Sequence, residues 1–117
     1  MKIPFKKGDI MVKNNHWIFI FDGLKLSGPQ LAVVYHAVCS FDGYTTVGRG
    51  PGIGYYDPFY PENFRLATND EKKLLFNRIK IKGTYWDKTT FNMRYSDNNE
   101  IIPDRVPNLD EQMIEIE

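Results

Sequence analysis

The sequence predicts an α+β fold: a bent antiparallel sheet, or a small SH3-like β-barrel, with one α-helix in the second half of the chain. Short apolar runs between turn residues fill the first half, a helix signature begins near residue 68, and a run rich in Thr and aromatic residues follows. We expect one α+β domain over residues 1–100, with strands from about 5 to 66, a helix near 69–82, and one strand or a hairpin near 84–95. An acidic tail over 101–117 carries a predicted short edge strand at Met113–Ile116.

The predicted strands of the first half are Ile10–Lys13, His16–Phe21 and about Leu31–Phe41. Asp-Gly pairs follow the second and third strands, at Asp22–Gly23 and Asp42–Gly43, and predict a turn at each place. Both of these strands are apolar on both faces, so both faces must be covered. A barrel core could cover one face, and a helix, an aromatic loop or a second subunit the other, which leaves a homodimer open.

The helix is predicted by signals at both of its ends. Thr68 and Glu71 fit a capping box, in which the Thr hydroxyl accepts from the Glu amide and the Glu carboxylate accepts from the Thr amide. Gly83 fits the position just past the last turn, where a left-handed backbone ends many helices. The buried face is predicted from apolar residues at helical spacing, namely Leu75, Phe76 and Ile79.

The segment Gly48–Gly54 carries alternate glycines and raises the question of a phosphate-binding loop. A P-loop requires Lys-Ser or Lys-Thr after the last glycine, with a helix beginning there, and neither is found. The dinucleotide fingerprint also fails, because Ile53 stands where a third glycine is required. In an extended segment, alternate glycines instead leave a bare strip of backbone that another group can approach closely. Pro51 predicts that the segment lies at a sheet edge.

Aromatic residues and prolines follow the glycines as far as Phe64. They predict either rings that close off the core or an exposed surface that contacts another protein. The candidate protein-interaction residues are Arg49, Tyr55, Tyr56, Phe59 and Tyr60. The leading prediction is therefore a non-catalytic binding or accessory module with an unidentified protein as its partner.

Nucleic-acid binding by a small barrel is the alternative prediction. Basic residues near the end of the helix and beyond could follow a phosphate backbone, while neighbouring rings stack on bases. The candidate residues are Arg78, Lys80, Lys82, Tyr85, Lys88 and Arg94. Lys plus Arg equals Asp plus Glu at 15 each, so the overall charge gives no reason to expect tight binding to nucleic acid or to a membrane.

An enzyme of unassigned class is the third interpretation. Cys39 and His36 are three residues apart, so on a regular strand they point to opposite faces and cannot form a catalytic dyad. The two histidines and one cysteine offer no metal-ligand spacing, and we predict no catalytic, cofactor or metal residue. A lone cysteine excludes an internal disulfide, and the N-terminus lacks the apolar stretch of a signal peptide. We therefore expect a cytoplasmic protein without membrane contact.

A resemblance to a known family adds to these predictions. The residues that carry it are Arg65, Leu66, Ala67, Thr68, Glu71, Lys72, Leu75, Phe76, Gly83 and Trp86, together with the opening Phe5–Val12. In these positions the chain resembles a family of small uncharacterised proteins of gut Bacteroides-type bacteria and their phages and mobile elements. Asp87 stands where that family usually has Asn. The resemblance implies a bacterial cytoplasmic setting and a mobile-element origin, and its members have no assigned activity to transfer.

Overall fold

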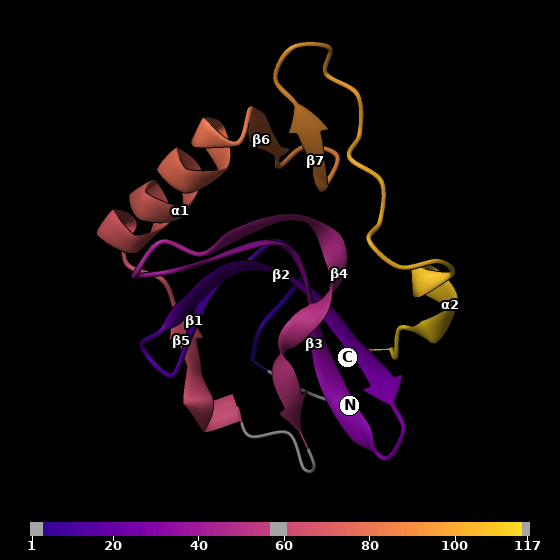
Figure 1. The fold of residues 1–117 in the computed structure, drawn as a ribbon. Helices are drawn as coiled ribbons and strands as arrows, with labels where there is room; N and C mark the ends of the chain where they lie inside the picture. Colours follow the sequence, from indigo (N-terminus) through magenta and orange to yellow (C-terminus); the bar gives the residue numbers. More distant parts are fainter. Residues whose placement is uncertain (1–3, 57–60, 116–117) are drawn as a thin grey trace.

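The computed structural model describes residues 4–56 and 61–115, which form a bent five-stranded antiparallel sheet, a two-stranded sheet and helices (Figure 1). The strands of the large sheet follow the spatial order β4-β3-β2-β1-β5. They are β1 (Ile10–Lys13), β2 (Trp17–Ser27), β3 (Gln30–Ser40), β4 (Thr45–Tyr56) and β5 (Phe64–Leu66), and a 3₁₀ turn, η1 (Pro61–Asn63), precedes β5. The predicted α+β fold is confirmed, and within the described residues the sheet does not close into a barrel.

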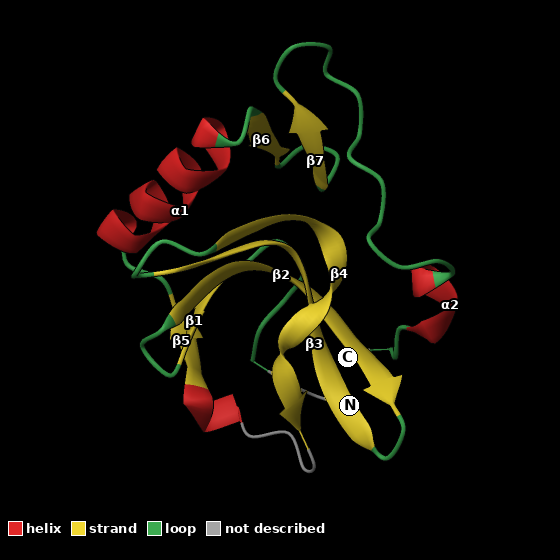
Figure 2. Cartoon of the chain, in the orientation of Figure 1, coloured by secondary structure: helices red, strands yellow, loops and turns green. Residues whose placement is uncertain are grey.

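The second half of the chain covers one face of the sheet. Helix α1 (Asn69–Ile81) and the hairpin of β6 (Thr84–Asp87) and β7 (Asn92–Tyr95) lie together over the bent strands (Figure 2). The chain then runs down the β4 side to a short helix, α2 (Leu109–Gln112). The hairpin confirms one of the two forms predicted for the run after Gly83, whereas no sequence signal predicted α2.

Helix α1 begins and ends as the sequence predicts. The Thr68 hydroxyl accepts from the Glu71 amide at 3.2 Å, and the Glu71 carboxylate accepts from the Thr68 amide at 2.8 Å. Gly83 adopts the expected left-handed backbone, with φ at +75°. Leu75 and Ile79 are buried, but Phe76 keeps 37% of its surface exposed, so its predicted core position is wrong. The face of the helix that is buried against the sheet is therefore narrower than the three apolar residues predict.

Two apolar clusters fill the two faces of the sheet. The first gathers Met11, Phe19, Phe21 and Val33, and the bend of the sheet brings Phe64 of β5 onto it. The second is covered by α1 and the β6–β7 hairpin, and its members include Ile18, Ile20, Cys39, Leu75, Ile79 and Met93. Burial of this apolar area stabilises the fold by roughly 25 cal/mol per Å². The cover that the sequence requires on both faces therefore comes from within the chain.

One predicted turn is wrong. Asp22 and Gly23 do not end a strand, because β2 continues to Ser27 and pairs with β3 along that length. The Asp-Gly pair instead lies at a shift of register, where Gly23 adopts a φ of +133° and Asp22 is buried. The second Asp-Gly pair does form the predicted turn, between Ser40 at the end of β3 and Thr45 at the start of β4.

The C-terminal segment, residues 103–115, is attached to the large sheet. Leu109 of α2 is buried, and the Ile114 amide donates to the Leu24 carbonyl at 2.9 Å. Met113 pairs with Lys25 of β2 as an isolated antiparallel bridge, and residues 113–115 form no strand at the place of the predicted edge strand Met113–Ile116. Ile116 lies outside the described residues. Among the described helices, none is both long and apolar enough to cross a membrane.

Candidate functional site

The alternate glycines of β4 leave room for two side chains from elsewhere in the fold. A Cβ atom added to Gly50 would lie 2.8 Å from the guanidinium of Arg105, and one added to Gly52 would lie 2.6 Å from the Tyr35 hydroxyl. At Gly48, where φ is +124°, an added Cβ would also meet Arg105. Strand β4 lies at the edge of the large sheet, as Pro51 predicts. The side chains of Arg105 and Tyr35 thus fill the space above the glycines. The segment is a strand and does not have the geometry of a phosphate-binding loop.

Arg105 closes the outer edge of β4 with three hydrogen bonds. Its amide donates to the Arg49 carbonyl at 2.8 Å, its Nε to the Gly48 carbonyl at 3.0 Å, and its Nη2 to the Pro51 carbonyl at 3.1 Å. The guanidinium also lies 5.0 Å from the centre of the Tyr35 ring, within the range of a cation–π contact. These contacts satisfy edge carbonyls that would otherwise invite another strand.

Beside Arg105 lies an open hollow of about 270 Å³, which we call the aromatic pocket. Its lining residues are Trp17, Tyr35, Val38, Tyr44, Pro51, Gly52 and Arg105. The Trp17 and Tyr44 rings meet edge to face at 5.6 Å, and the Thr46 hydroxyl donates to the Tyr44 hydroxyl at 2.7 Å. Tyr44 is 55% exposed, so one wall of the pocket faces solvent. This volume falls just below the roughly 300–1,000 Å³ of small-molecule sites and suits one or two side chains.

Tyr35 forms the buried floor of the aromatic pocket. Burial raises the pKa of its phenol, although the positive charge of Arg105 opposes the rise. The phenol is therefore neutral near pH 7 and serves as a ring surface and a hydroxyl, not as an anion. Grooves lined by tyrosine and tryptophan are typical of sites that hold extended polypeptides.

A second group of polar residues lies at three irregularities of the large sheet. Register shifts occur at Asp22 of β2, at His36 and Ala37 of β3, and at Gly48 and Arg49 of β4. Such bulges turn side chains away from the regular alternation. Together they bring Asp22, His36 and Arg49 into contact, although these residues come from three different strands.

We call this group, with two carboxylates of the C-terminal segment, the Arg49 cluster. Arg49 donates to Asp22 at 2.5 Å, to Asp104 at 3.1 Å and to Asp110 at 2.6 Å. His36 Nε2 lies 3.1 Å from the other oxygen of Asp22, and its ring packs against Trp86 at 4.7 Å. The cluster thus joins strands β2, β3 and β4 to the C-terminal segment.

The electrostatics of the Arg49 cluster favour a permanent ion pair. Burial alone would raise the pKa of Asp22, but hydrogen bonds and charge from His36 and Arg49 outweigh it and lower that pKa. Asp22 is therefore ionised near pH 7, with both oxygens bonded. An open hollow of about 450 Å³ adjoins these residues, and no hydroxyl or thiol lines it among the described residues. With Asp22 paired on both sides, the arrangement joins strands β2, β3 and β4 to the C-terminal segment.

The predicted protein-interaction residues fall in different places. Arg49 pairs with the carboxylates of its cluster and lines the open hollow beside it. The backbones of Tyr55 and Tyr56 end β4. Phe59 and Tyr60 lie outside the described residues. Sequence reasoning missed four residues of the aromatic pocket, Trp17, Tyr35, Tyr44 and Arg105, because they come from separate elements and share no local motif.

The predicted nucleic-acid residues lie at the end of α1 and on the β6–β7 hairpin, and they differ in whether their charges are already used within the fold. Arg78 donates to the carbonyls of Ser40 and Phe41, and Arg94 donates to Asp87 at 2.9 Å. Lys80 and Lys82 are exposed at the end of α1, and Lys88 lies in the turn between β6 and β7. Tyr85 donates to Asn99 and lines a hollow with Lys80. Both arginines of the set are therefore occupied by internal bonds.

The expected separation of Cys39 and His36 does not hold. The bulge at His36 and Ala37 breaks the alternation of β3, so His36 meets Trp86 on the face that also holds Cys39. No hydrogen bond joins the two residues in the described part of the chain. Burial raises the pKa of the Cys39 thiol to about 11, so it stays protonated at neutral pH. Across the described residues, no group of three or more His, Cys, Asp or Glu side chains could hold a metal ion.

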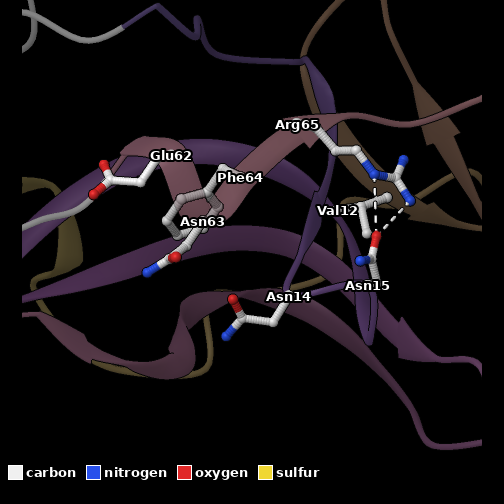
Figure 3. A pocket seen from close by; sticks show the side chains of 7 residues that line it. All are labelled: Val12, Asn14, Asn15, Glu62, Asn63, Phe64 and Arg65. Carbon is white, nitrogen blue, oxygen red and sulfur yellow. Dashed lines mark hydrogen bonds between the residues drawn. The ribbon is translucent and has the colours of Figure 1, made fainter.

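A further hollow lies beside β1 and β5, at the edge of the large sheet opposite β4 (Figure 3). Its lining residues are Val12, Asn14, Asn15, Glu62, Asn63, Phe64 and Arg65. Arg65 donates to Asn15 at 3.1 Å and to Glu71 at 2.7 Å, so its charge is used within the fold. The hollow therefore has fewer free charged groups and fewer aromatic surfaces for a partner to contact than the aromatic pocket has.

The geometry described above defines an α+β domain with an open aromatic pocket. Comparison with protein-family models, with curated proteins and with solved structures finds no match to this chain. The resemblance to the Bacteroides-type family stays a prediction.

Proposed function

We propose that this chain is a non-catalytic binding module that holds an extended segment of a partner protein in the aromatic pocket. The observation that carries the proposal is the pocket itself, where Trp17, Tyr44 and Pro51 present ring and proline surfaces to solvent. Aromatic side chains offer large contact area at a low cost in conformational entropy, and they dominate the energetics of protein interfaces. The setting is the bacterial cytoplasm, and the origin a bacterial or mobile-element one, as the resemblance implies.

A polypeptide suits this pocket better than a nucleic-acid strand does. Strands of nucleic acid are held by a series of cations along the phosphate backbone. Arg105 is the one cation that lines the pocket among the described residues. A protein segment needs only an apolar anchor with a few polar contacts, and the pocket provides those.

The test is selection of peptides from a random library displayed on phage, with the full chain immobilised. Selected peptides are synthesised with a fluorescent label, and their affinity is measured by anisotropy for the wild type and for Tyr44→Ala. Loss of one aromatic anchor should weaken binding by about tenfold or more. Tyr95→Ala is the matched control, since Tyr95 is also exposed, at 40%, but lies on β7 outside the pocket.

Two outcomes contradict the proposal. In the first, no selected peptide depends on Tyr44. In the second, labelled oligothymidylate binds in a Tyr44-dependent manner with a steep loss of affinity in salt, as several phosphate contacts require. A polypeptide held by rings and one arginine should lose only a few-fold affinity between about 50 and 200 mM salt.

A further inference from the structure

We infer that Arg105 makes the aromatic pocket selective for a segment that carries a carboxylate beside its apolar anchor. This inference rests on the proposed function, and it names the chemistry of the partner. Its basis is the positive charge of the pocket, which no acidic side chain in the described lining balances. The lining includes Arg105 and, among the described residues, no acidic side chain.

The guanidinium of Arg105 is held in place before any ligand arrives. Two of its N–H groups are fixed on the carbonyls of Gly48 and Pro51, and its plane lies near the Tyr35 ring. The glycine strip allows this close approach, since a side chain at Gly50 would occupy the same space. A guanidinium that is already ordered loses little freedom when it binds, so more of the interaction energy appears as affinity.

The same guanidinium retains donors for a ligand. An arginine carries five N–H donors. Two are used on the carbonyls of Gly48 and Pro51, and the guanidinium also interacts with the Tyr35 hydroxyl, so at most two or three donors remain. Within the described residues, Arg105 forms no ion pair with a carboxylate. Carboxylates match the fork of a guanidinium and form short, charge-assisted hydrogen bonds with it.

Arg49 of β4, the strand that Arg105 contacts, provides an internal comparison. Its guanidinium contacts three carboxylates, so its positive charge is compensated within the fold. Arg105 follows Asp104 directly in the chain, yet Asp104 pairs with Arg49 and not with Arg105. The fold therefore satisfies one arginine and presents the other, uncompensated, at the wall of the aromatic pocket.

The experiment is a double-mutant cycle between Arg105 and the carboxylate of a selected peptide. The peptide from the display selection is made in three forms: unchanged, with each Glu or Asp replaced by Gln or Asn, and with an amidated C-terminus. The second and third forms distinguish a side-chain carboxylate from a terminal one. Affinity is measured for the wild type and for Arg105→Gln. Changes made in the peptide cannot disturb the fold, which guards against a structural effect of the Arg105 substitution.

We expect neutralisation of the carboxylate to weaken binding to the wild type by about tenfold, the effect of one charge-assisted hydrogen bond. The same change should have no effect on the Arg105→Gln variant. Arg105→Lys should retain part of the discrimination, because it keeps the charge and loses the fork. Circular dichroism and the denaturation midpoint check that both variants remain folded.

The inference is overturned if neutralisation weakens binding equally in both proteins, or if Tyr44-dependent peptides carry no carboxylate. In either case peptides still bind through Tyr44, so the proposed function survives. A library that yields no Tyr44-dependent peptide contradicts the proposed function instead, and the inference with it. The two failures are therefore distinct.

Discussion

The smallest residues of β4 decide which side chains can reach its surface. Gly50 and Gly52 occupy equivalent positions on one face, yet different neighbours fill the space above them. Above Gly52 lies the ring of Tyr35, which is 4% exposed and held in the core. Above Gly50 lies the far end of Arg105, a long side chain on the surface. A methyl group added at the two positions therefore compares a neighbour fixed by burial with a surface neighbour that its hydrogen bonds to β4 hold in place.

We expect Gly52→Ala to destabilise the protein by about 1–3 kcal/mol, the usual cost of overpacking against a buried ring. Gly50→Ala should stay within about 1 kcal/mol of the wild type, because displacing Arg105 breaks only surface hydrogen bonds that water can replace, and alanine also restricts the unfolded chain. Urea denaturation of the two variants measures the difference in free energy of unfolding. Equal costs at the two positions would show that Arg105 is held as rigidly as Tyr35.

At the scale of elements, the start of α1 is sensitive to acid. The hydrogen-bonded guanidinium of Arg65 lowers the pKa of Glu71 to about 2, with support from Thr68 and against a smaller effect of burial. Because this pKa lies below the ordinary value of 4.5, the stabilisation is complete above about pH 4.5 and is lost as the pH falls toward 2.

The difference in stability between the wild type and Glu71→Gln should therefore shrink as the pH falls through this window. Chemical denaturation at several pH values measures it. Asp70→Asn is the control, because Asp70 lies in the same turn and forms no ion pair among the described residues. A gap between the wild type and Glu71→Gln that stays constant down to pH 2 would contradict the role of the ionised carboxylate.

The ion pairs that attach the C-terminal segment to the sheet should contribute unequally to stability, according to how deeply each carboxylate is buried. The side chain of Asp22 is 7% exposed, whereas that of Asp110 is 82% exposed. Arg49→Met leaves Asp22 buried with one partner fewer and should cost about 3 kcal/mol or more. Asp110→Ala removes only an exposed ion pair and should cost about 1 kcal/mol or less. Urea denaturation measures both values.

Hydrogen exchange provides a second measurement on these variants. Amides of the C-terminal segment should exchange faster in Arg49→Met than in the wild type, whereas Asp110→Ala should change them little. If both substitutions cost the same, the ion pairs act alike in spite of their different burial, and the ranking is wrong.

How much of these elements the sequence predicts depends on how local each signal is. The capping box of α1 lies within four consecutive residues, so Thr68 and Glu71 predict it fully. The Asp22–Gly23 pair is also local, but a turn and a bulge both use a glycine with positive φ, and only pairing with β3 decides between them. The aromatic pocket has no local signal at all, since Trp17, Tyr44 and Arg105 meet only after strand register is set.

At the scale of the whole molecule, the reaction rate of the Cys39 thiol should measure how often the protein unfolds. Its side chain is fully buried between the sheet and α1, and burial raises its pKa to about 11. Only the thiolate reacts quickly with thiol reagents, so the native protein should react very slowly at neutral pH. Reaction should occur through unfolding, and its rate should rise with destabilisation.

Labelling with an aromatic disulfide reagent, followed by absorbance, tests this expectation. The destabilised Gly52→Ala variant should react faster than the wild type, and Gly50→Ala should react at nearly the wild-type rate. In denaturant all three should react at once. Rapid labelling of the native wild type would show that Cys39 is accessible without unfolding.

Arg105 comes after β4 in the chain, and this order matters during protein synthesis. Strand β4 leaves the ribosome well before Arg105 does, so the carbonyls of Gly48, Arg49 and Pro51 emerge without their later partners. A nascent chain at this stage presents a long, glycine-rich edge to the nascent chains beside it on the same messenger RNA. The period in which this protein is most exposed to co-aggregation therefore ends only once Arg105 has emerged and bound β4.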